Sequence, residues 1–119
     1  RMKTASYRDL IVWQKSVEIV IHIYQITETF PREDVFGLTS QMRRAAVSLP
    51  SNIAEGRYRG TKKDFCHFLR IAFASGAELE TQLEIAKRLS RISSSEYDKV
   101  NAELEEVMKM LNVMLSKLV

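Results

Sequence analysis

The sequence has few of the residues that build catalytic or metal sites. It contains one cysteine, Cys66, and two histidines, His22 and His67. One cysteine cannot form an internal disulfide or a thiolate metal cage, and neither histidine has a partner at metal-ligand spacing. Phosphate-binding glycine loops, nucleophile elbows and zinc-protease motifs are absent too. We therefore expect no metal, no cofactor and no enzymatic activity.

Long hydrophobic runs are also missing. The most apolar stretch, residues 17–26, carries Glu18, His22 and Gln25, whereas a membrane span needs about 20 apolar residues. No positively charged start leads into an apolar signal region. We expect one compact domain over residues 1–119, in a reducing cytoplasm and away from the membrane.

Hairpin turns such as Asn-Gly and Asp-Gly do not occur, and apolar residues recur at intervals of three and four. The pattern predicts an all-α protein. Breaks at 29–37, 56–60 and 92–96 predict four helices, at about 9–29, 37–56, 61–91 and 95–118. Because the connections are short, neighbouring helices should be antiparallel, which gives an up-down four-helix bundle. The third helix is predicted to be the longest and to overhang the bundle.

Two of these helices have a single apolar face each. In the fourth, residues from Tyr97 to Leu118 form one seam, with Ser95 and Asp98 as its predicted capping pair. In the third, Thr61 and Asp64 are the predicted capping pair, and the face from Phe65 to Ala86 includes Gly76. A glycine in mid-helix predicts that another helix approaches closely there.

The second helix contains a proline at position 50. Its apolar residues keep the same phase before and after Pro50, which predicts that the helix bends there without stopping. We expect a kink at Pro50 and a left-handed C-cap at Gly56.

The first helix has two apolar stripes about 130° apart. One runs through Leu10, Trp13, Val17, Val20, Ile21 and Tyr24. The other contains Val12, Ile19, Ile23 and Ile26. Since a small bundle buries one stripe per helix, the second predicts contact with another copy of the chain. The alternative is a central helix covered on both sides by its own chain. The residues of the predicted oligomer interface are Val12, Ile19, Ile23, Ile26, Ile85, Leu89 and Ile92.

Positive charge is concentrated in the middle of the chain. Residues 43–70 hold seven Lys and Arg against Glu55 and Asp64, although the formal net charge is only +3. Such a patch favours a polyanion as ligand, and a solubilising surface is the alternative. The predicted nucleic-acid-binding residues are Arg43, Arg44, Arg57, Tyr58, Arg59, Lys62 and Lys63, with Tyr58 available to stack on a base.

Three segments carry a resemblance to a known family: DLIVWQKSVEIV (9–20), LTSQMRRAAVSLPSNIAEG (38–56) and FLRIAFASGAELETQLEIA (68–86). The chain resembles the small four-helix-bundle proteins encoded in intervening sequences of bacterial large-subunit (23S) ribosomal RNA genes. The resemblance implies a bundle that assembles as a ring of five with a basic surface. A related accessory protein of diversity-generating retroelements binds nucleic acid beside a reverse transcriptase, which by analogy favours nucleic acid as the ligand.

Two functional hypotheses follow. The first is a non-catalytic homo-oligomer, pentameric by resemblance, that binds RNA or DNA through its basic surface. The second is a protein-interaction scaffold with no nucleic-acid ligand, in which the overhang of the third helix contacts a protein partner. The salt dependence of RNA binding separates the two.

Overall fold

A computed structural model describes residues 6–118, so residues 1–5 and 119 of the predicted domain lie outside the described part. Four helices make up most of it: α1 (Ile11–Thr27), α2 (Leu38–Arg59), α3 (Lys62–Arg88) and α4 (Ser94–Leu118). Two short 3-10 helices, η1 (Tyr7–Asp9) and η2 (Arg32–Asp34), precede α1 and α2. The all-α class is confirmed, and α3, with 27 residues, is the longest helix as predicted.

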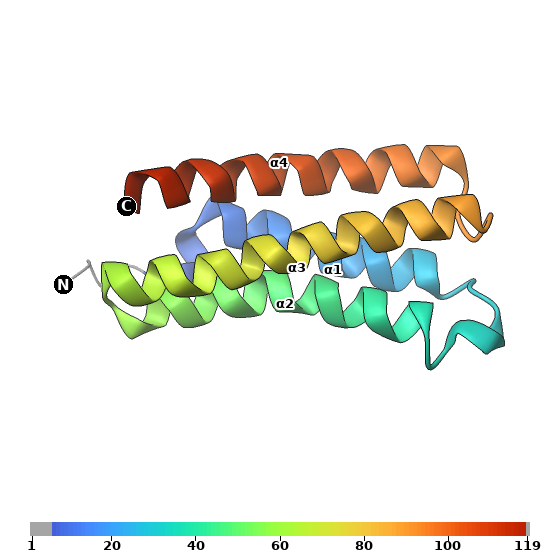
Figure 1. Ribbon diagram of the computed structural model, residues 1–119, viewed down its shortest axis with the longest axis horizontal. Helices are drawn as coiled ribbons and strands as arrows, with labels where there is room; N and C mark the ends of the chain where they lie inside the picture. The colour runs from blue at the N-terminus through green and yellow to red at the C-terminus, as the bar shows by residue number, and fades with distance from the viewer. Residues whose placement is uncertain (1–5, 119) are drawn as a thin grey trace.

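The helices run up and down and form an antiparallel bundle of 47 × 23 × 20 Å (Figure 1). Each packs against its chain neighbour, and α4 closes the bundle by packing on α1. The connections 28–37 and 89–93 lie at one end, and the α2–α3 turn lies at the other. Because α1 is only 17 residues long, the α2–α3 hairpin extends beyond its start. The overhang therefore belongs to both helices of the hairpin.

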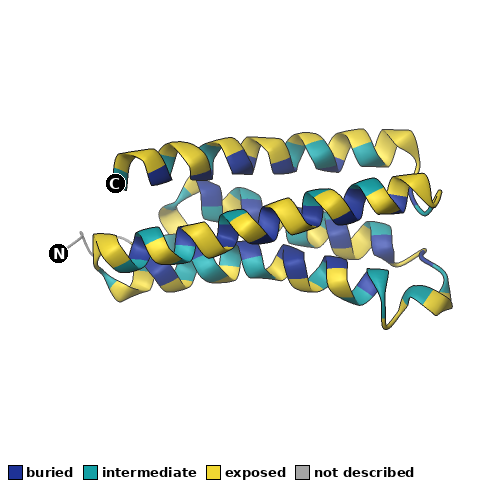
Figure 2. Ribbon diagram, viewed as in Figure 1, coloured by how far each residue is buried: buried dark blue, intermediate teal, exposed yellow. Residues whose placement is uncertain are grey.

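The core is one cluster of mostly aliphatic side chains from all four helices. Figure 2 shows that the buried positions lie on the inward faces of these helices. The predicted faces of α2, α3 and α4 supply it, including Leu49 and Ile53 from α2, Leu79 from α3 and Leu104 from α4, all fully buried. At Gly76 an added Cβ would collide with the side chain of Met108 on α4. The predicted close approach at this glycine is therefore confirmed.

Helix α2 is continuous through Pro50, as its apolar phase predicts. The kink at Pro50 stays a prediction. The helix does not end at Gly56: it continues to Arg59, and Gly60 is the left-handed cap with φ 83°. Gly56 is instead buried against α3, where a Cβ would lie 2.7 Å from the Phe68 Cβ. The predicted cap was wrong because Gly56 is needed for close packing.

The predicted N-terminal capping pair of α3 is confirmed, and the one predicted for α4 is wrong. The Thr61 hydroxyl accepts a hydrogen bond from the Asp64 N–H at 3.1 Å, as predicted. The capping pair of α4 is Ser93 and Glu96 in place of Ser95 and Asp98. The Ser93 hydroxyl accepts from the Glu96 N–H at 3.1 Å, and Glu96 Oε1 accepts from the Ser93 N–H at 2.9 Å. This reciprocal pair satisfies two backbone donors, so α4 begins one residue earlier than predicted.

Both stripes of α1 contact the core of their own chain, which favours the alternative of a central helix covered on both sides over the predicted contact with a second copy. Val12, Ile19 and Ile23 are buried in the core of the single chain, so they are not available to a second copy. Ser16 and Thr27 share this face and are buried as well, because their hydroxyls donate to the carbonyls of Val12 and Ile23, at 2.7 and 2.6 Å. A stripe that contains two hydroxyls is thus the inward one.

The remaining residues of the predicted oligomer interface are divided between core and surface. Ile92 is buried, which removes it from the interface, and Ile26 is half-buried against the core. Ile85 and Leu89 are exposed near the end of α3. On α1, Ile21 and Tyr24 of the other stripe are the exposed ones. Leu10, Trp13 and Val20 of that stripe pack against the core, so only its end at Ile21 and Tyr24 faces outward.

Candidate nucleic-acid interface

The α2–α3 turn gathers five of the seven predicted nucleic-acid-binding residues at one end of the bundle. Arg57, Tyr58 and Arg59 form the last turn of α2, and Lys62 and Lys63 begin α3. Gly60 joins the two helices: its N–H donates to the Arg57 carbonyl at 3.2 Å. We call these five residues the basic tip.

The aromatic side chain of the basic tip points into solvent. Tyr58 is 85% exposed, so it does not pack on the bundle. A tyrosine ring in this position has a free face on which a base can stack, and the positively charged side chains around it would lie along the phosphate backbone of a bound nucleic acid.

Arg59 is held against the helices, whereas Lys62 and Lys63 are not. Its Nη2 donates to Glu55 Oε2 at 2.9 Å, and its guanidinium lies 4.7 Å from the centre of the Phe68 ring. Lys62 and Lys63 are exposed and form no ion pair with any residue in the range 6–118. Both lysines are therefore available to an anion.

The positions of the two lysines are unfavourable for the helix that carries them. The N-terminus of a helix has a partial positive charge and unpaired N–H groups, and cations there destabilise it. Asp64 offsets this charge in the first turn of α3, but the turn keeps an excess of one positive charge. Stability of α3 does not explain Lys62 and Lys63, whereas an anion bound at the tip would.

Arg43 and Arg44 are not part of this tip. They precede Arg57 by more than ten residues on the same helix, which separates them from it by about 20 Å. Arg43 is half-buried: its Nε donates to Thr27 Oγ1 at 2.9 Å, and its guanidinium lies 4.4 Å from the centre of the Tyr24 ring. Arg43 therefore joins α2 to α1. The single patch that the sequence predicted is two separate regions.

One basic residue of the predicted patch was not among the predicted binding residues. Arg70 is exposed and lies seven residues after Lys63 on α3. Residues seven apart share one face of a helix, so this spacing was the signal that could have identified it. Arg70 extends the positive surface from the tip along α3.

Other kinds of site find no support in the described part of the chain. Between residues 6 and 118, no three His, Cys, Asp or Glu side chains are grouped so that they could hold a metal ion. His22 instead contacts α4, with its Nδ1 2.8 Å from Glu103 Oε1. None of the helices in this range has the length and apolar character of a membrane span.

Comparison with known proteins identifies the family. The family model of the 23S rRNA-intervening sequence protein matches residues 8–113. A similar solved structure is that of a protein of unknown function from the S23 ribosomal protein family of Bacteroides thetaiotaomicron VPI-5482. It is 27% identical, with a TM-score of 0.79, over 88% of this chain and 98% of its own. No curated protein matches. The chain therefore belongs to the 23S rRNA-intervening sequence protein family.

Proposed function

We propose that this protein is a non-catalytic homo-oligomer that binds nucleic acid through the basic tip. The observation that carries the proposal is the pair Lys62 and Lys63, two cations without ion-pair partners in the described chain, placed where they disfavour their own helix. Beside them Tyr58 exposes its ring. Backbone phosphates would be contacted by the lysines and by Arg59, and a base could stack on Tyr58.

Assembly would strengthen this binding. Each subunit of an oligomer presents one basic tip, and several tips on one strand raise the avidity by orders of magnitude without any new contact. The resemblance to the family implies five subunits. Single-site binding is therefore expected to be weak, and binding by the assembled protein is expected to be strong.

The salt dependence of binding tests the proposal. Each contacted phosphate contributes a log–log slope of about −0.7 to −0.9, depending on whether the nucleic acid is single- or double-stranded. The double variant Lys62→Gln/Lys63→Gln should flatten the slope by about 1.4 to 1.8 per tip. The readout is fluorescence anisotropy of a labelled structured RNA, and of a single-stranded DNA, over a range of salt concentrations.

A matched control removes two cations at the opposite end of the bundle. Lys87→Gln/Lys99→Gln changes the net charge equally but leaves the tip intact, so its slope should equal that of the wild type. Tyr58→Ala should weaken binding of single strands by about 1–3 kcal/mol. If the wild-type protein binds neither RNA nor DNA at low salt, or if both double variants behave alike, nucleic-acid binding by the basic tip is wrong. The scaffold function would then take its place.

A further inference from the structure

Among residues 6–118, the most exposed large apolar side chain lies at the end of the bundle opposite the basic tip. Phe36 is 97% exposed, in the connection between α1 and α2. Its neighbour Val35 is also exposed, whereas Phe30, at the start of the same connection, is buried. A phenylalanine fully in water contributes nothing to the fold of its own chain. Such a side chain is typical of a contact with another molecule.

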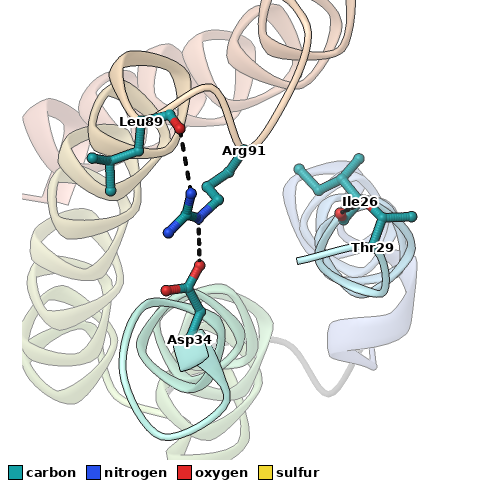
Figure 3. Close-up of polar contacts among 5 residues, drawn as sticks. All are labelled: Ile26, Thr29, Asp34, Leu89 and Arg91. Carbon is teal, nitrogen blue, oxygen red and sulfur yellow. Dashed lines mark hydrogen bonds and ion pairs between the residues drawn. The ribbon is translucent and has the colours of Figure 1, made fainter. Parts of the chain in front are cut away.

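The backbone that carries Phe36 is fixed in place. The N–H groups of Asp34 and Gly37 donate to the carbonyls of Pro31 and Asp34, at 2.9 and 3.0 Å. The Arg91 Nε donates to Asp34 Oδ2 at 2.7 Å, and its Nη1 points to the Leu89 carbonyl (Figure 3). Arg91 thus ties the 31–37 connection to the end of α3. A projecting ring on an ordered loop loses little entropy on binding.

A groove of about 830 Å³ lies along α2, next to α1. Its apolar lining includes Tyr24, Phe30, Val35 and Val47. Tyr24, Val35 and Val47 are exposed although they are large apolar side chains. The groove therefore offers apolar surface that another molecule can cover. Phe36 of the same chain does not line the groove.

The charges around the ring and around the groove are complementary. Arg32 and Glu33 are exposed on the loop that carries Phe36, and the groove is lined by Glu28 and Arg44. None of these four side chains forms an ion pair with another residue between 6 and 118. The loop of one copy and the groove of another therefore offer two opposite-charge pairs, Glu33 with Arg44 and Arg32 with Glu28. Charges arranged in this way fix the orientation of a contact.

We propose that Phe36 of one copy of this chain inserts into the α1–α2 groove of a second copy, with Glu33 paired to Arg44 of that copy. This inference rests on the self-assembly proposed above and assigns it a surface. Because the ring and the groove are different patches, the contact is head-to-tail. Every copy keeps one unused patch until the assembly closes on itself, so more than two chains are needed.

The first test measures mass by light scattering at micromolar concentration. Phe36→Ser should weaken self-association by at least about 30-fold and give a monomer, as expected for loss of a central aromatic anchor. Tyr58→Ser is the matched control, because it removes an exposed aromatic ring at the opposite end and should leave the mass of the wild type. An oligomeric Phe36→Ser protein would overturn the inference while leaving self-assembly intact. A monomeric wild type would overturn both.

Two further experiments test the partners. Phe36→Ser lacks the ring and Val47→Glu blocks the groove, so each variant alone should be monomeric. In an equimolar mixture, the ring of the Val47→Glu chain can enter the groove of the Phe36→Ser chain. No further contact is then possible, so the mixture should form two-chain complexes only. Glu33→Arg and Arg44→Glu should each weaken assembly, and the double variant should restore it. A Val47→Glu protein with wild-type mass that fails to bind RNA would assign the groove to nucleic acid and refute self-recognition. Failure of the double variant to recover would also count against it.

Discussion

Gly56 provides a sharp test of how α2 packs on α3. Replacing it with alanine removes the helix penalty of glycine, which is a gain of about 0.5–1 kcal/mol. The new Cβ, however, would lie 2.7 Å from the Phe68 Cβ and 3.2 Å from Cδ1 of Phe65. A Cβ atom is fixed to its backbone, so the contact with Phe68 is relieved only if α3 moves away from α2. Overpacking of this kind costs about 1–3 kcal/mol.

The expected net effect of Gly56→Ala is a loss of about 1–2 kcal/mol in the free energy of unfolding. For a domain of this size, each kcal/mol lost from the free energy of unfolding lowers Tm by about 5 °C, so Tm should fall by about 5–10 °C. Thermal unfolding followed by circular dichroism, at equal protein concentration for all variants, measures the difference.

Gly76→Ala is the matched control, because it is the same change in the middle of α3. There the new Cβ meets the end of the Met108 side chain, which is flexible and can take another rotamer. Its stability should stay within about 1 kcal/mol of the wild type. If Gly56→Ala unfolds at the same temperature as the wild type or higher, the tight α2–α3 contact described here does not exist in solution.

Three further predictions concern other parts of the bundle. Pro50→Ala should keep the helix content and straighten α2, because it restores a backbone donor; lower helicity by circular dichroism would contradict this. Ile19→Glu should lower the free energy of unfolding by at least about 4 kcal/mol and unfold the protein, since the Ile19 side chain is fully buried. A variant that stays folded but forms a smaller oligomer would show instead that this stripe belongs to the oligomer interface. Burial raises the pKa of Tyr97, and the charge and hydrogen bond of Glu84 raise it further, so the stability that the neutral phenol contributes is present below pH 10 and lost as pH rises through the folded pKa. Tyr97→Phe should remove this part of the loss of stability at alkaline pH. Identical profiles of stability against pH for the variant and the wild type would refute this prediction.

The sequence by itself determined the helices and the inward faces of three of them. In α2, α3 and α4 a single apolar face exists, so only one rotation of each helix buries it. The continuity of α2 through Pro50 also followed from the unbroken phase of its apolar residues. Local patterns were sufficient for these features because they depend on residues within a few turns of each other.

The tertiary structure decided which stripe of α1 faces inward and where the charged residues gather. Both stripes of α1 are apolar, and Ser16 and Thr27 appear polar in a sequence although their hydroxyls bond to their own helix. The sequence predicted Gly56 as a cap, and only the contact with Phe68 shows that Gly56 is a packing residue. Arg43 and Arg57 are close in sequence but separated by the rise of the helix between them. Each of these outcomes depends on which segments meet in space, and local periodicity contains no information about that.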